Sequence, residues 1–159
     1  MRLKKFLVSV VLNLSLLSTV ANADIFLHSD RLAGEDMCAG LAGLWKGNGS
    51  VSAKVLGINI KCEYYGNATV RETGLHTYST DVLFELQSGS NLCPGKEAYT
   101  LPGTCDSNTG QITMKSNEAD LTGHLENNGK QASLKGTVKI KVKNQTITAN
   151  ANSVVLTKQ

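Results

Sequence analysis

The clearest pattern in the sequence is ASLKGTVKIKVK at residues 132–143. Every second residue from Ala132 to Val142 is apolar or glycine, and the residues between them are polar. Successive side chains of a β-strand point to opposite faces, so this alternation predicts a strand with one buried and one solvated face. The buried face would hold Ala132, Leu134, Gly136, Val138, Ile140 and Val142, and the solvated face Lys135, Thr137, Lys139, Lys141 and Lys143.

The same period of two recurs on both sides of this stretch. Turn residues such as Leu56-Gly57 and Asn127-Asn128-Gly129 separate the runs, and these short connections predict that consecutive strands are antiparallel neighbours. Further inward rows are predicted at Ile58, Ile60, Cys62 and Tyr64; at Tyr78, Thr80, Val82, Phe84 and Leu86; at Ala119, Leu121, Gly123 and Leu125; and at Ile147, Ala149, Ala151, Ser153 and Val155.

These runs predict an all-β domain at residues 44–159, a single antiparallel up-and-down barrel of eight or nine strands. Closure is favoured over an open sheet because it hides the edges of the sheet. Residues 24–43 are a lead-in with a short helix around residues 30–41. The one irregular excursion is residues 88–106, which contain both prolines and are predicted to cross a mouth of the barrel or flank its wall.

The first 23 residues have the features of a secretory signal peptide. Basic residues precede an apolar run at residues 6–20, and Ala21-Asn22-Ala23 supplies the small residues that a signal peptidase needs. The apolar run is shorter than the roughly 20 residues that span a bilayer. We therefore expect cleavage after Ala23 and a secreted or periplasmic protein without a transmembrane anchor.

Four cysteines follow the predicted cleavage site, and an even count in an exported chain indicates two disulfides. No C-x-x-C pair is present, so the spacing does not favour a zinc site. Three pairings are open. The pairing between nearest cysteines, Cys38 with Cys62 and Cys93 with Cys105, is the one we predict.

Charge is unevenly distributed along the predicted mature chain. Residues 24–126 hold thirteen acids and seven bases, whereas residues 127–159 hold six lysines and no acid. Lysines on one strand face can bind a polyanion, or they can protect the strand from pairing with another edge. This segment has no aromatic residue that would stack on bases, so nucleic acid is not an expected partner. The candidate partner-binding residues are Lys130, Lys135, Lys139, Lys141 and Lys143.

Large and small side chains are divided between the predicted inward rows. The first half supplies large residues, and the last three strands supply alanine and glycine. An eight-stranded barrel is at the size where the interior is either filled or holds one small ligand, and both outcomes stay open. The candidate ligand-binding residues are Trp45, Tyr64, Tyr78 and Phe84.

The motif Gly43-Leu44-Trp45, between a short lead-in and the predicted barrel, resembles the lipocalin and broader calycin pattern. The resemblance covers about residues 43–158 at the level of architecture. It implies that the tryptophan packs across one end of the barrel and that the interior or mouth binds a small, often apolar molecule. Lipocalins also stack an arginine near the last strand on this tryptophan, and no arginine follows Arg71 here.

No motif in the sequence predicts an enzyme, a cofactor or a metal site. His28, His76 and His124 lie outside any nucleophile motif, and the cysteines are better used as disulfides. His124 and Glu126 share one strand face but lack a third ligand. Asp81 and Glu85 would be about 13 Å apart along a strand, too far for either glycosidase geometry.

Two hypotheses of function follow. In the first, the chain is an exported, non-enzymatic binding protein that takes a small apolar or amphipathic ligand in or at the mouth of the barrel, at the Trp45 end or at the end with residues 93–105. In the second, it is a secreted surface-interaction or inhibitor protein that docks a macromolecule or polyanion through the lysine-rich strand face.

Overall fold

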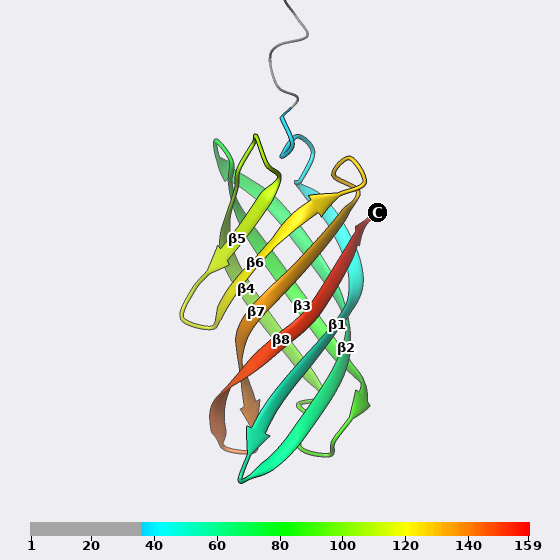
Figure 1. Cartoon of the computed structure of the whole chain (residues 1–159), viewed down its shortest axis with the longest axis vertical. Helices are drawn as coiled ribbons and strands as arrows, with labels where there is room; N and C mark the ends of the chain where they lie inside the picture. Colours follow the sequence, from blue (N-terminus) through cyan, green and yellow to red (C-terminus); the bar gives the residue numbers. More distant parts are fainter. Residues whose placement is uncertain (1–35) are drawn as a thin grey trace, which may run out of the picture. The chain divides into compact units, whose positions relative to one another are not determined.

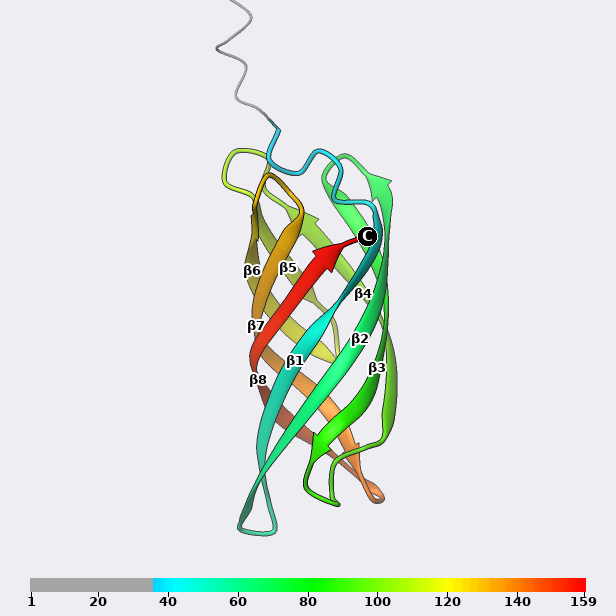
Figure 2. The ribbon, with the colours of Figure 1, turned by 90° about the vertical axis from the view of Figure 1, so that its right-hand side faces the viewer.

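The computed structural model describes residues 36–159, which form eight antiparallel strands and no helix. Each strand pairs with the next along the chain, and the last pairs with the first, so the sheet closes into a ring (Figures 1 and 2). The strands are β1 (Gly43–Val55), β2 (Ile58–Gly74), β3 (Thr77–Gly89), β4 (Lys96–Cys105), β5 (Gln111–Lys115), β6 (Ala119–Glu126), β7 (Gln131–Val142) and β8 (Gln145–Lys158).

The core lies inside the ring and is built from the predicted inward rows. In β7, the apolar side chains between positions 132 and 142 are buried or partly buried, and Lys135, Lys139 and Lys141 are exposed. In β3, Tyr78, Thr80 and Val82 are buried, as the period of two predicts. Because one face of every strand is hidden by closure, alternation in the sequence translates directly into burial.

The alternation predicted for β8 is wrong after Ala151. Asn152 and Ser153 are both exposed, and Val154 is buried in place of Ser153. A β-bulge causes this shift, since the pairing with β7 skips from Leu134 opposite Val154 to Gly136 opposite Ala151. The remaining inward residues after the bulge are Val154 and Leu156, so Val155 also points the other way.

Gly136, beside this bulge, marks a close approach between strands β6 and β7. Its φ angle is 148°, in the region that favours glycine, and a Cβ atom would lie 2.0 Å from the carbonyl oxygen of Asp120. Another misassigned residue is Ile58, predicted to point inward but 60% exposed at the tip of the β1–β2 hairpin.

About half of the irregular segment predicted at residues 88–106 forms a β-strand. Only its first part is a loop, and residues 96–105 form β4, which pairs with β3 along most of its length. The short helix predicted around residues 30–41 falls partly outside the described residues. Residues 37–40 form a turn instead, and Cys38 and Leu41 are buried in the core. The predicted signal peptide and its cleavage site also lie outside the described residues.

Two disulfides are present, but the predicted pairing is wrong: Cys38 bonds to Cys105, and Cys62 bonds to Cys93. The reason is β4, which lies between Cys93 and Cys105. A strand of ten residues at about 3.3 Å per residue carries the two cysteines to opposite ends of the ring, far beyond the roughly 7 Å limit for a disulfide. Two disulfides are typical of an oxidising extracellular or periplasmic environment.

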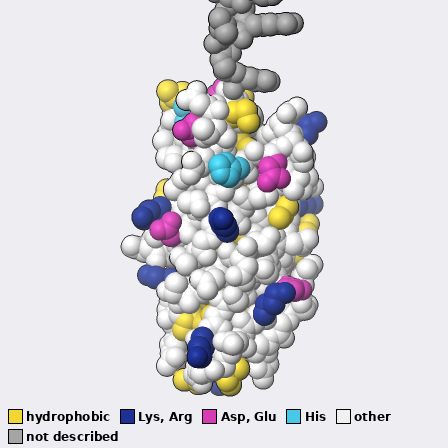
Figure 3. Space-filling view, viewed as in Figure 1, with side chains coloured by type: hydrophobic (Ala, Val, Ile, Leu, Met, Phe, Trp, Pro, Cys, Tyr) yellow, Lys and Arg dark blue, Asp and Glu magenta, His cyan; other side chains and the backbone are white. Residues whose placement is uncertain are grey.

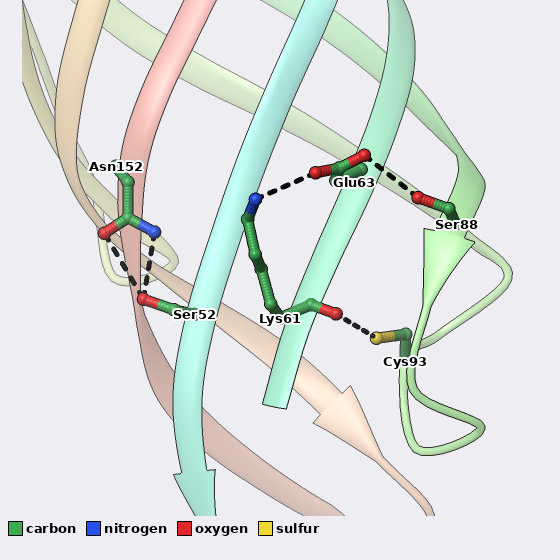
Figure 4. A network of polar contacts seen from close by, with 6 residues as sticks. All are labelled: Ser52, Lys61, Glu63, Ser88, Cys93 and Asn152. Atoms are coloured by element: carbon green, nitrogen blue, oxygen red, sulfur yellow. Dashed lines mark hydrogen bonds and ion pairs between the residues drawn. The ribbon is translucent and has the colours of Figure 1, made fainter. Parts of the chain in front are cut away.

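The outer face of the ring carries short-range polar contacts between neighbouring strands. Glu63 on β2 accepts hydrogen bonds from Lys61 and from Ser88 on β3 (Figure 4). These bonds hold the pKa of Glu63 below its usual value. Ser52 and Asn152 form a similar contact between β1 and β8. Within residues 36–159, no helix is long and apolar enough to cross a membrane.

Candidate functional site

The wall of the ring is incomplete between β4 and β7. Strand β5 has only five residues, and β4 pairs with it only through Gly103–Cys105. The ladder between β6 and β7 ends at Ala119 opposite Val138, and one more backbone bond follows, from the N–H of Lys139 to the carbonyl of Glu118 at 2.7 Å. Strand β7 continues beyond the turn that joins β5 to β6 (Figure 1). Residues 96–102 of β4 and residues 139–142 of β7 therefore flank a gap that no described strand occupies. We call this gap the side slot.

The backbone of β4 presents an unpaired edge to the side slot. Cys105 donates its N–H to His76 on the β3 side, and the next residue, Asp106, donates to Gln111 on the β5 side. Because alternate residues of a strand direct their backbone groups to the same neighbour, Pro102 faces the slot. Proline has no N–H and occurs in sheets at such open edges.

Tyr99 spans the side slot. Its side chain belongs to the inward row of β4, and its hydroxyl donates a hydrogen bond of 2.8 Å to the carbonyl oxygen of Lys139 on β7. Neighbouring strands in a sheet are about 4.8 Å apart and are joined by backbone bonds. Here β4 and β7 are joined through the side chain of Tyr99. This hydrogen bond closes the slot between the two strands. It is made by a side chain, which can change rotamer, and not by a ladder of backbone bonds.

A surface pocket and an interior cavity adjoin each other at the side slot. The outer pocket has a volume of about 390 Å³, and behind it lies a cavity of about 40 Å³. Glu97 and Tyr99 line both of them. The other residues of the outer pocket are Ala98, Thr100, Asn117, Glu118, Lys139, Lys141 and Thr146. Those of the inner cavity are Gly49, Val51, Tyr64, Phe84, Leu101, Ala119, Leu121, Val138, Ile140, Ala151 and Val154.

The inner cavity is small and its walls are largely hydrocarbon. A volume of 40 Å³ holds a few water molecules or a short alkyl group, and it is far below that of the usual drug-sized site, about 300 Å³ or more. The small residues predicted to leave room do so here, since Ala119 and Ala151 both line the cavity. The large side chains of the opposite wall fill most of the remaining interior.

The pKa values of two tyrosines at the inner cavity are raised. Burial raises the pKa of Tyr64 to about 12, and the charge of Glu97 adds to the effect. The pKa of Tyr99 is also raised, first by burial, then by Glu97, with a smaller contribution from Glu118. Burial, the larger cause, disfavours a charge of either sign here, and the nearby carboxylates add a smaller penalty for a further negative charge.

The structure brings together two of the four candidate ligand-binding residues. Tyr64 and Phe84 line the inner cavity, with their ring centroids 6.3 Å apart. Trp45 and Tyr78 are also buried, but they pack in the core without lining the cavity. Sequence reasoning missed Glu97 and Tyr99. The alternation of Glu97, Tyr99 and Leu101 was present in the sequence, but the prolines and cysteines around it favoured an irregular segment.

The Trp45 end of the ring is covered. Trp45 is 2% exposed and donates its indole N–H to the carbonyl of Leu41 at 3.0 Å. The Nζ atom of Lys158, in the last strand, lies 5.9 Å from the centre of the Trp45 ring and also bonds the carbonyl of Gly40. Lys158 thus lies over the tryptophan, and within the described part of the chain residues 36–43 cover this end of the ring.

The five candidate partner-binding lysines are spread along β7 and beyond both its ends. Lys135, Lys139 and Lys141 lie on its outer face, and Lys130 and Lys143 lie in the turns before and after it. Among the residues that the structure describes, none of the five forms an ion pair. Figure 3 shows basic and acidic side chains scattered among uncharged ones on one face of the molecule.

One group of potential metal ligands occurs among residues 36–159. Asp36, Cys38 and His76 have ligand atoms within 4.8 Å of one another. The sulfur of Cys38 is bonded to Cys105, so it has no thiolate to offer a metal. His124 and Glu126, on the outer face of β6, do not belong to a group of three. Neither a protein-family model nor a curated protein matches this chain.

Proposed function

We propose that this chain is an exported, non-enzymatic binding protein that takes a small amphipathic ligand through the side slot. The observation that carries the proposal is that an outer polar pocket and an inner apolar cavity adjoin each other, with Glu97 and Tyr99 lining both. The polar part of the ligand would lie in the slot, and a short apolar part would enter the cavity once Tyr99 releases Lys139.

A calycin-like architecture fits this proposal. The ring of eight antiparallel strands and the buried Trp45 across one end support it. We place access at the side slot and not at the Trp45 end, because residues 36–43 cover that end. The opposite end is packed as well, by a second buried cluster that includes Val55, Ile60 and Val142.

Filling the cavity tests the proposal. Ala151→Val adds two methyl groups on a strand, where β-branched residues fit well, and we expect it to weaken the binding of hexanol, a neutral amphiphile, at least fivefold, or about 1 kcal/mol. Binding is measured by titration of hexanol followed by NMR chemical shifts of residues around the cavity. The control is Asn150→Val, which adds the same side chain on the outer face of the same strand.

Equal hexanol affinity of the wild type and Ala151→Val would contradict the proposal. So would shifts confined to residues remote from the cavity. Circular dichroism of both variants checks that the added side chain has not disrupted the sheet, since overpacking a core costs about 1–3 kcal/mol.

A second candidate function is the docking of a polyanion on β7. It is favoured by one observation, the lack of ion pairs at the five lysines, whereas Lys61, Lys96 and Lys115 each have an acidic partner. Replacing Lys135, Lys139 and Lys141 with glutamate should then abolish salt-dependent retention on heparin, because phosphate- or sulfate-binding lysines act through their charge. Retention at unchanged salt after this triple replacement counts against the second candidate.

A further inference from the structure

The outer pocket of the side slot holds charges of both signs, from Glu118, Lys139 and Lys141, which are exposed, and from Glu97, which also lines the inner cavity. Glu97 belongs to the inward row of β4 and is partly buried. Lys139 and Lys141 belong to the outward row of β7, whose inward row is Val138 and Ile140. Of the residues that line the inner cavity, Glu97 alone carries a charge. A ligand that passes the lysines therefore meets a carboxylate at the entrance to the cavity.

Glu97 has no basic partner among the described residues. Some acids on the outer faces of strands β2, β3 and β6 do have one, whereas the exposed Glu72 and Glu126, like Glu97, do not. Glu63 pairs with Lys61 at 2.9 Å, and Glu85 pairs with Lys96 at 3.1 Å. Burying part of a carboxylate without a counter-ion is costly, so Glu97 is placed where a cation from outside the chain would be stabilised.

Aromatic rings stand next to this carboxylate. Phe84 lies between Tyr64 and Tyr99, with ring centroids 6.3 Å and 6.4 Å away, and all three rings line the cavity with Glu97. The face of an aromatic ring attracts a cation, and the effect increases when the site is screened from water. Aromatic rings beside a carboxylate are the combination that recognises an ammonium group.

The carbonyl oxygen of Lys139 supplies a further acceptor. This oxygen accepts a hydrogen bond from the Tyr99 hydroxyl. When Tyr99 changes rotamer, the oxygen would be free to accept a hydrogen bond from an ammonium group. The side chain of Lys139 is exposed on the outer face of the strand, where it lines the outer pocket and not the inner cavity. Burial is the largest cause of the raised pKa of Tyr99, and the charges of Glu97 and Glu118 add to it.

We propose that the side slot selects a small primary amine with an apolar body, for which Glu97 is the counter-ion and Tyr64, Phe84 and Tyr99 form the aromatic wall. This inference rests on the proposed function and adds the chemical class of the ligand. The cavity of about 40 Å³ admits a short alkyl group in the closed form, so a small aliphatic amine fits better than a long-chain lipid.

Three probes of equal chain length test the charge preference: hexylamine, hexanol and hexanoate. We measure the affinity of each by NMR titration at pH 7, where the amine is protonated and the acid is ionised. A charge-assisted hydrogen bond is about twice as strong as a neutral one, so we expect hexylamine to bind about tenfold more tightly than hexanol. Hexanoate should bind more weakly than both.

The variant Glu97→Gln separates charge recognition from a structural role. It keeps the size of the side chain and removes its charge, so the tenfold preference for hexylamine should disappear while the affinity for hexanol stays the same. Glu85→Gln is the matched control on the neighbouring strand, since Glu85 is an exposed outer-face acid, and it should keep the preference. A merely structural Glu97 would lower the affinity for both probes equally.

The outcomes are distinguishable. If hexanol binds at the cavity and hexylamine binds no more tightly, or if Glu97→Gln retains the preference, the inference about amines is overturned and the proposed function stands. Tighter binding of hexanoate also overturns it. If none of the three probes shifts the resonances of cavity residues, the proposed function fails together with the inference.

Discussion

Replacing both Cys38 and Cys105 with alanine is expected to lower the free energy of unfolding by about 4 kcal/mol in the chain-entropy model. The disulfide joins cysteines 67 positions apart, so its loss frees a long loop in the unfolded chain. It also holds residues 36–41 against the core, where Leu41 accepts the indole N–H of Trp45. Chemical denaturation followed by tryptophan fluorescence measures the change.

The second disulfide supplies the comparison. Cys62 and Cys93 are 31 positions apart, so replacing both with alanine should cost slightly less, about 3.5 kcal/mol. Alanine is chosen because a serine hydroxyl would be buried without a partner at these sites. A loss below about 1 kcal/mol for the first pair would contradict the prediction. Peptides that link Cys93 to Cys105 in an unreduced digest would contradict the pairing itself.

The period of two was sufficient to predict the closed antiparallel sheet, because closure hides one face of every strand. It failed where the backbone leaves the regular pleat. The bulge opposite Lys135 reverses the faces of Ser153 and Val155. One extra residue in a strand does not alter the composition of the sequence, so the composition did not indicate the bulge. The disulfide pairing failed for a related reason, because the strand between Cys93 and Cys105 was taken for a loop.

The candidate site was harder to predict than the fold. Alternation along single strands placed Tyr64 and Phe84 in the interior correctly. The side slot depends on a different property, the length of β5 relative to its neighbours, and on which residues lie opposite one another across the sheet. Tyr99 and Lys139 are joined by a hydrogen bond across 40 positions of sequence. The register of the sheet decides which residues of distant strands come together, and one sequence without a structure does not specify that register.

Trp45 is the residue whose truncation should cost most in the core. We expect Trp45→Ala to lower the free energy of unfolding by about 4 kcal/mol, the middle of the range for truncating a buried aromatic residue to alanine. Its side chain is 2% exposed, and its loss leaves a cavity beneath the lead-in. It also removes the hydrogen bond to Leu41 and the ring beneath Lys158. Urea denaturation followed by circular dichroism measures the change.

Tyr65→Ala is the control for this prediction. Tyr65 lies in β2 on the outer face and is 36% exposed, so its truncation should cost about 1 kcal/mol or less. If Trp45→Ala costs no more than Tyr65→Ala, Trp45 does not hold the lead-in against the ring. The two losses from Trp45→Ala and from the Cys38–Cys105 double replacement should also be less than additive, because both release the same residues 36–41 from the same end of the core.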